Sequence, residues 1–453
     1  MEKLRKTLRD SPYARWGILV LVGLILSVNY YFYDAFSSLK SLLIKEFDFT
    51  NTHYGLFVSF YSIPNTFLLM AVLGGMILDK LGIRRTGFVF VFFMALGAVL
   101  TAYGTTDYYR GGGIGFGFMT SFLPRYSPEL KMMLTGRFFY GLGAETSIVV
   151  VSKILVKWFR GKDLALAFGL KVGFGRMGTF LALRLSPTLA QEGSDLTTAV
   201  WFAAILVCIG LLTFMVYMLF DLRIDKEIEQ DGRKKEQEEK FHLRDILGII
   251  SNRAYLYILL LCVTFYAAVF PFVAYAPDFF FNKFGITTVE SGKVTSLLPL
   301  GTMLFTPLFG YLVDRKGYSA TAMIIGAATL LFVHLVFALT PLKPHFFLIL
   351  LGVAFSLVPA AMWPSMVKLV QEKEIGTAYG LMYSVQNLGL WGIPILAGMI
   401  LDRTNHGNTD ELNYTPTILM FAGLSLLGLL FGIMLKREDS RSGFGVELPL
   451  NKK

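Results

Sequence analysis

An acid and a base stand deep inside apolar stretches of this chain. Glu145 follows the run "GRFFYGLGA" and Arg176 follows "LALAFGLKVGFG". A charge at the centre of a bilayer costs about 2.5 kcal/mol or more, so it is retained where it pairs with another charge or lines the path of a solute. Glu145 and Arg176 are therefore expected either to bind the two ends of a small zwitterion or to form a structural salt bridge.

The expected helices place both charges at one depth. Glu145 lies 12 residues before Lys157, where its helix is expected to end, and Arg176 lies 12 residues after Leu164, where the next helix is expected to begin. At 1.5 Å per residue both lie about 18 Å from the same face, near the middle of a hydrocarbon core about 30 Å thick. If the two pair, Glu145 stays ionised, which favours facilitated diffusion over proton coupling.

The second half of the chain has aromatic and amide side chains where the first half has charges. The stretches "VPAAMWPS" and "YSVQNLGLWG" supply Trp363, Tyr383, Gln386 and Asn387. Seven residues separate Gly169 from Arg176 and also Gly380 from Asn387. We therefore expect Asn387 at the place equivalent to Arg176, in a site charged on one side and aromatic on the other. Packing inside the bundle is the alternative for the tryptophan and tyrosine.

Four further polar side chains lie in the expected helices of the first half. Tyr33 and Asp34 lie in "NYYFYDAF", where the acid is expected either to line the site or to face water. Lys171 lies five residues before Arg176, almost half a turn away around the helix, so it is expected to face elsewhere. Arg184 lies near a helix end and can extend to the membrane surface.

The composition explains where these residues must be held. The chain has 453 residues, of which 54% are hydrophobic and 16% charged, against about 25% charged in soluble domains. Apolar windows of membrane-spanning length recur along it. We predict an all-α membrane protein with twelve transmembrane helices near 16–36, 54–78, 86–103, 132–156, 164–185, 201–220, 255–279, 289–313, 320–339, 346–370, 378–401 and 416–435.

The spans divide into two groups of six. Residues 221–253 carry 8 basic and 9 acidic residues and are expected to form a charged cytoplasmic linker. We therefore predict an N-terminal six-helix bundle over 1–220 and a C-terminal bundle with its tail over 254–453. Most basic residues outside the spans fall on the side of both termini, which predicts that both termini are cytoplasmic.

A repeated motif relates the two halves. "GMILDKLG" contains Gly75, Asp79 and Gly82, and "GYLVDRKG" contains Gly310 and Asp314. The two copies lie 235 residues apart at matching turns, which indicates internal duplication. The chain here resembles the major facilitator superfamily, whose signature loop has this form and whose fold has two pseudo-symmetric six-helix bundles. Arg137 begins "RFFYGLG", which is similar to the superfamily's fourth-helix pattern. The resemblance implies alternating access and gating roles for these residues.

A narrower resemblance concerns the substrate. The Tyr33–Asp34 pair, Glu145 after Gly-x-Gly, Arg176 and "SVQNLGL" resemble the group around major facilitator superfamily domain-containing protein 1, whose members are dipeptide transporters of lysosomes. The resemblance implies that Glu145 meets the amino end of a peptide, that Arg176 meets its carboxylate and that Trp363 lies nearby. Lys171 and Arg184 depart from that group, so an organic anion or an amino acid is the alternative substrate. A transporter-like receptor that binds without translocation is a second alternative.

Other classes of protein fit the sequence less well. The five scattered histidines form no catalytic or nucleotide-binding constellation, so no enzyme, cofactor or metal is expected. The net charge of +10 is spread among short loops, which argues against nucleic acid. The expected partners are a small-molecule substrate and membrane lipid, and the expected state is a monomer. Because no acidic dileucine signal occurs in the N-terminal tail, a bacterial inner membrane is expected rather than a lysosomal one.

The predicted topology can be checked by labelling. With the two native cysteines replaced, Gln230→Cys in the linker should be protected from a membrane-impermeant thiol reagent in intact cells and should react after permeabilisation. Gly112→Cys, in the expected outer loop, is the control and should react in intact cells. Labelling of position 230 from outside would reverse the predicted orientation.

Overall fold

The computed structural model describes residues 11–159, 163–191, 195–230, 245–371, 374–406, 408 and 411–449, and its regular elements there are all helical. The first half contains α1 (Pro12–Ala35), η2 (Phe36–Leu39), α2 (Lys40–Phe47), α3 (Asn51–Ser59), η3 (Phe60–Ser62), α4 (Ile63–Phe67), α5 (Met70–Tyr103), α6 (Asp107–Arg110), α7 (Phe116–Thr120), α8 (Pro128–Phe159), α9 (Leu164–Leu189) and α10 (Leu196–Gln230). The second half contains α11 (Asp245–Ser251), α12 (Arg253–Phe284), α13 (Thr288–Thr295), α14 (Leu297–Lys316), α15 (Ser319–Leu339), α16 (Pro344–Met366), α17 (Ile375–Thr404) and α18 (Thr415–Ser442).

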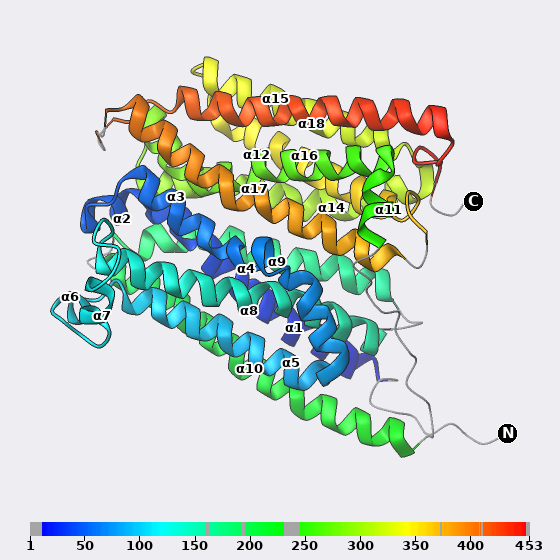
Figure 1. The fold of residues 1–453 in the computed structure, drawn as a ribbon, viewed down its shortest axis with the longest axis horizontal. Helices are drawn as coiled ribbons and strands as arrows, with labels where there is room; N and C mark the ends of the chain where they lie inside the picture. Colours follow the sequence, from blue (N-terminus) through cyan, green and yellow to red (C-terminus); the bar gives the residue numbers. More distant parts are fainter. Residues whose placement is uncertain are drawn as a thin grey trace.

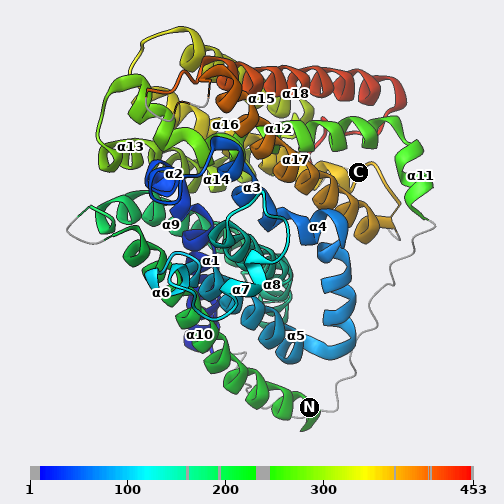
Figure 2. The ribbon, with the colours of Figure 1, turned by 60° about the vertical axis from the view of Figure 1, so that its left-hand side comes forward.

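The long helices gather in two bundles that lie side by side. In Figure 1 the helices of the first half form the lower group and those of the second half the upper group, all running roughly along the long axis. α1 begins and α18 ends at the same end of the molecule, which we call the termini side. The opposite end, called the far side, carries α2, α6 and α7 (Figure 2). This arrangement confirms the predicted all-α membrane fold.

Within the described residues, eleven helices are long and apolar enough to cross a membrane. The second predicted segment, 54–78, is the one that does not form a single helix. It is divided into α3, η3, α4 and the first part of α5. Pro64 has no N–H to continue a helix, and Leu69 has a left-handed backbone with φ +52°. Gly82, with φ +77° and ψ 169°, then turns the chain inside α5 into the third predicted segment.

Two glycines let α8 pack against its neighbours without a gap. A Cβ at Gly141 would lie 2.0 Å from the carbonyl oxygen of Tyr61, and one at Gly143 would lie 2.3 Å from the backbone nitrogen of Met94. Only a residue without a side chain fits at these close approaches. The glycines of the fourth-helix pattern thus fix how closely α8 lies against η3 and α5.

The predicted loops contain more regular structure than expected. The glycine-rich stretch after α5, part of an expected outer loop, carries the short helices α6 and α7. Residues 221–230 of the predicted linker continue α10, and 245–251 form α11. Residues 231–244 lie outside the described part of the chain, as do 1–10 and 450–453. The domain boundaries at 220 and 254 stay predictions.

Candidate functional site

Glu145 and Arg176 do not pair with each other. Both side chains are partly exposed, on α8 and α9, and no ion pair within 4.0 Å joins them in the described residues. The Glu145 carboxylate instead accepts a hydrogen bond of 3.3 Å from Nδ2 of Asn65. Tyr30 on α1 lies within electrostatic range of both charges. The predicted acid and base therefore lie near the same tyrosine but do not form a salt bridge with each other in the described residues.

Aromatic rings from both bundles surround the Arg176 guanidinium. Its central carbon lies 4.6 Å from the centre of the Phe355 ring and 5.6 Å from the centres of the Tyr30 and Phe270 rings. Such contacts stabilise a cation by about 0.5–2 kcal/mol without using its N–H donors. Among the residues described, we find no hydrogen bond to Arg176. The guanidinium is thus held in place with donors free for an incoming carboxylate.

The C-terminal bundle presents a stack of aromatic rings to this region. The Trp363 ring stacks on Tyr383 at 4.6 Å and on Tyr379 at 5.9 Å between ring centres. Its indole N–H donates a 3.0 Å hydrogen bond to the hydroxyl of Tyr266. Tyr383 is 39% exposed and lies within electrostatic range of Glu145. The stack therefore leaves one exposed ring close to the acid from the other bundle.

The two predicted amides lie deeper in the C-terminal bundle. Asn387 is buried and donates a 3.1 Å hydrogen bond from Nδ2 to the carbonyl oxygen of Tyr383. Its Oδ1 is buried without a hydrogen-bond partner in the described part of the chain. Gln386 is also buried, and its Oε1 accepts a weak 3.9 Å hydrogen bond from the thiol of Cys262. These contacts tie both amides to their own bundle.

Asp34 is buried rather than open to water at the membrane surface. Its carboxylate accepts a 2.7 Å hydrogen bond from the hydroxyl of Thr179 on α9. The neighbouring Tyr33 ring lies 4.7 Å from Tyr61 and 6.3 Å from Phe270, on the other bundle. Of the two expected positions for Asp34, the structure therefore has the one inside the protein.

Arg137 is enclosed by aromatic rings with no carboxylate partner among the described residues. It is 1% exposed, and its Nε donates a long 3.4 Å hydrogen bond to the carbonyl oxygen of Phe57. The guanidinium carbon lies 4.9–5.8 Å from the ring centres of Tyr33, Phe36, Phe57, Tyr61 and Tyr140. Its Nη1 has no hydrogen-bond partner there. This environment joins α1 and α3 to α8.

Lys171 and Arg184, the two other cations on α9, have hydrogen-bond partners away from Arg176. The Lys171 amine donates a 2.6 Å hydrogen bond to the hydroxyl of Ser152 on α8. Nε of Arg184 donates a 3.1 Å hydrogen bond to the hydroxyl of Ser296, which belongs to the other bundle. Neither side chain adds its charge to the group around Arg176.

The two copies of the repeated motif are held differently. Asp79 forms a 2.6 Å ion pair with Lys153 on α8, whereas Asp314 is exposed and has no ion pair in the described residues. Gly317, at φ +76°, lies so close to 447–449 that a Cβ would meet the carbonyl oxygen of Glu447 at 2.4 Å. Gly75 and Gly310 have open space where a Cβ would point. The motif therefore retains its turns while its contacts differ between the halves.

The sequence analysis missed a buried ion pair that joins the bundles at the far side. Lys40 is 1% exposed, and its amine lies 2.6 Å from Oδ2 of Asp278 and 2.6 Å from Oδ1 of Asn51. The hydroxyl of Tyr414 also donates a hydrogen bond to the Asp278 carboxylate. The ammonium and carboxylate are thus both paired and hydrogen-bonded, which a buried ion pair requires.

A second carboxylate joins the two bundles at the far side. Asp402 on α17 accepts four hydrogen bonds of 2.6–3.0 Å from the backbones and side chains of Asn51 and Thr52, at the start of α3. Negative charge is favourable at a helix N-terminus, where backbone N–H groups lack partners. Tyr54 adds a 2.9 Å hydrogen bond to the carbonyl oxygen of Ala274. In the part of the chain described, the hydrogen bonds that we find between the bundles lie in the far half.

Some of these missed residues had a signal in the sequence. Asp278 lies at the last turn of the expected helix 255–279, and Asp402 follows the expected helix 378–401. Neither residue was singled out from the sequence. Charged residues at the same end of helices in opposite bundles could have been considered as pairs, but sequence alone does not show which ends meet.

Comparisons with known proteins agree with the overall fold. A model of the Major Facilitator Superfamily matches residues 22–394. The lysosomal dipeptide transporter MFSD1 of Mus musculus is 31% identical over 386 residues, covering 83% of this chain and 78% of the mouse protein. A solved structure of a mutant nucleoside transporter NupG has a TM-score of 0.71 at 15% identity, covering 92% of this chain and 99% of that one. A bacterial homologue of the human lysosomal transporter Spinster gives 0.68 at 13% identity, with coverage of 94% and 98%.

The far-side ion pair predicts a measurable coupling. Lys40→Met leaves a buried carboxylate without its cation, and Asp278→Asn leaves the ammonium without its anion, so each should cost about 3–5 kcal/mol. The double variant should lose less than the sum of the two. Thermal unfolding of the purified protein measures the cycle. The partly exposed Arg110–Glu46 pair, at 2.5 Å on the same side, is the control and should contribute about 1 kcal/mol or less. Additive losses at Lys40 and Asp278 would contradict their coupling.

Proposed function

The chain belongs to the major facilitator superfamily, and we propose that it carries a small zwitterionic solute, a dipeptide, across the membrane by alternating access. By family it is an integral membrane transporter and not an enzyme. The relatives named lysosomal dipeptide transporters support the substrate class, at 30–31% identity over more than four-fifths of this chain. The observation that carries the proposal is the separation of Glu145 from Arg176, because each keeps a charge available for a ligand.

We propose that Glu145 binds the peptide's ammonium group and Arg176 its carboxylate. An extended dipeptide spans roughly 3.3–3.6 Å per residue, so two separate charges on neighbouring helices suit its two ends. The rings around the guanidinium orient it without occupying its donors. The stacked Trp363 and Tyr383, with Tyr33 opposite, would contact the peptide side chains. Asp34, Gln386 and Asn387 are proposed to shape the wall behind these groups.

The proposed gating concerns the termini side and the far side, which would open in turn. The hydrogen bonds found between the bundles lie in the far half, which supports a state closed at the far side. The basic bias of the sequence supports cytoplasmic termini, and a bacterial inner membrane is the proposed location. Asp79 and Asp314, with the motif glycines Gly75, Gly82 and Gly310, would serve the changes at the termini side. Arg137, nine residues into α8 from its far-side end, would serve gating in the far half. Breaking the far-side contacts while closing the termini side would reverse access.

The alternatives differ in what they require. An organic anion is the alternative substrate that the positive charges of Lys171 and Arg184 favoured. These side chains donate hydrogen bonds to Ser152 and Ser296, away from Arg176. A receptor would bind peptide without flux into proteoliposomes. Uniport was favoured on the condition that Glu145 pairs with Arg176, and no ion pair joins them in the described residues. Both uniport and proton coupling stay in the proposal, and peptide flux with and without a pH gradient separates them.

The peptide-end assignment predicts two selective losses. Acetylating the amine of a dipeptide or amidating its carboxylate should each weaken binding about 10- to 100-fold, because a charged hydrogen bond contributes roughly 1.5–3 kcal/mol. Glu145→Gln should lose sensitivity to acetylation, and Arg176→Gln to amidation, each variant binding poorly overall. Calorimetry on the purified protein measures both effects. Lys171→Gln removes a cation from the same helix and should keep both sensitivities. Equal binding of blocked and free peptides by the wild type would reject the assignment.

The gating assignment predicts an effect on rate. The Asp79–Lys153 pair is partly exposed, with side chains 45% and 28% accessible, so it adds little to stability. Asp79→Asn should slow peptide uptake into proteoliposomes at least tenfold and change affinity less than about twofold, since the charge lies outside the proposed binding groups. Lys153→Gln should have the same effect, and the exchanged pair Asp79→Lys with Lys153→Asp should restore part of the rate. Loss of binding with the fold intact would instead place Asp79 in the substrate site.

A further inference from the structure

The last turns of α18 form a basic hollow that the transport site does not use. A hollow of about 400 Å³ opens at the termini side, between α18 and α15. Its lining consists of Ile324, Ile433, Lys436, Arg437, Ser440 and Arg441. Among the described residues, no acidic side chain lines it. Lys436 has the Glu447 carboxylate at 3.6 Å, which leaves the charges of Arg437 and Arg441. Two like charges in one hollow are electrostatically unfavourable unless an anion offsets them.

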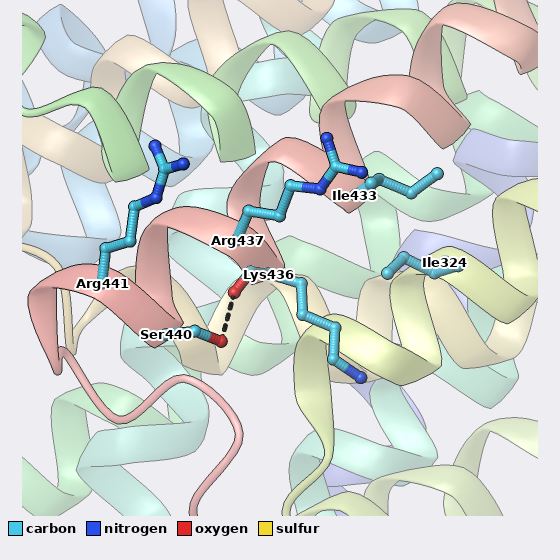
Figure 3. A pocket seen from close by; sticks show the side chains of 6 residues that line it. All are labelled: Ile324, Ile433, Lys436, Arg437, Ser440 and Arg441. Carbon is cyan, nitrogen blue, oxygen red and sulfur yellow. Dashed lines mark hydrogen bonds between the residues drawn. The ribbon is translucent and has the colours of Figure 1, made fainter.

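The arrangement of the cations fits a single anionic group. Arg437 and Arg441 lie one helical turn apart, and Figure 3 shows their guanidinium groups pointing to the same side. Both are exposed, and we find no hydrogen bond or ion pair for either in the described residues. Lys436 lies on the other side of the hollow, where its amine donates a 2.6 Å hydrogen bond to Thr321 and lies 3.6 Å from Glu447. The nearby carboxylate of Asp439 is already occupied by backbone N–H groups of 446 and 447.

The depth of the hollow indicates a lipid rather than a soluble anion. Lys436 lies 21 residues after Thr415, the first residue of α18, about 32 Å along the helix axis. A hydrocarbon core about 30 Å thick would end close to this point. Ile324 and Ile433 line the deeper end, and beside them Ile325, Leu430 and Met434 are 54%, 46% and 40% exposed. An exposed apolar surface therefore continues directly from the basic hollow.

We propose that this hollow binds the phosphate headgroup of an anionic phospholipid from the leaflet at the termini side. The phosphate oxygens accept hydrogen bonds from Arg437 and Arg441, and Ser440 and Lys436 border the headgroup. The acyl chains lie along the exposed apolar residues of α15 and α18. Basic hollows between transmembrane helices are suited to such headgroups. The site is separate from Glu145 and Arg176 and does not depend on the identity of the transported solute.

Native mass spectrometry of the full-length protein in detergent tests the proposal with phosphatidylglycerol, phosphatidylcholine and inorganic phosphate as probes. Phosphatidylglycerol should remain bound, whereas phosphatidylcholine and phosphate should not. The double variant Arg437→Gln with Arg441→Gln should weaken phosphatidylglycerol binding roughly 20- to 30-fold, since each cation near an anionic lipid contributes about fivefold. Arg437→Lys with Arg441→Lys keeps the charges and should lose less, which separates the loss of charge from a failure to fold.

The matched control is Arg85→Gln with Arg223→Gln, which removes two exposed cations from the termini side of the other bundle. It should bind phosphatidylglycerol as the wild type does. An equal loss in this control would show that net charge alone attracts the lipid, and would overturn the site. Equal retention of phosphatidylcholine, or binding of phosphate alone, would overturn the lipid assignment. So would unchanged binding in the arginine-to-glutamine variant.

Discussion

An unpaired charge in hydrocarbon is costly, and most of the polar architecture of this protein avoids that cost. Lys40 is buried against Asp278, and Asp221 is buried between Arg84 and Lys157. These charges are paired and hydrogen-bonded within the fold, which limits their role to holding helices together. Glu145 and Arg176 lie in the same apolar surroundings but are not joined to each other. The proposed binding site rests on this absence of an ion pair between them in the described residues.

The site is asymmetric even though the fold is repeated. The N-terminal bundle contributes the acid and the base, while the C-terminal bundle contributes the stack around Trp363 and the rings that face Arg176. A ligand that spans the two would contact charges on one side and apolar rings on the other. Such a division suits a zwitterion with variable side chains, because the ends are constant and rings tolerate different shapes.

The contacts between the bundles also differ along the membrane normal. Lys40 and Asp402 each join elements far apart in the sequence at the far side, where close backbone approach adds to the contact. A Cβ on Gly55 would lie 2.3 Å from the carbonyl oxygen of Pro394, and one on Gly398 would lie 2.2 Å from that of Asn51. Hydrogen bonds and small residues therefore combine where the bundles close. Under the proposed alternating access, opening this side would break a buried ion pair, and that cost would oppose the change of access.

Apolar periodicity and the repeated Gly-x-x-x-Asp motif were sufficient to predict the helical membrane fold and the family. These features are local, because each depends on a window of one helix or one turn. The sequence did not predict the break of the second segment at Leu69, the partners of Lys171 and Arg184, or the meeting of Lys40 with Asp278, 238 positions away. It also left open whether Glu145 and Arg176 pair, since two residues at one depth can face each other or face a common ligand. Those outcomes depend on helix rotation and on which helix ends meet. Tertiary packing alone fixes both, because hydrophobic pattern specifies a helix face only to within a broad stripe.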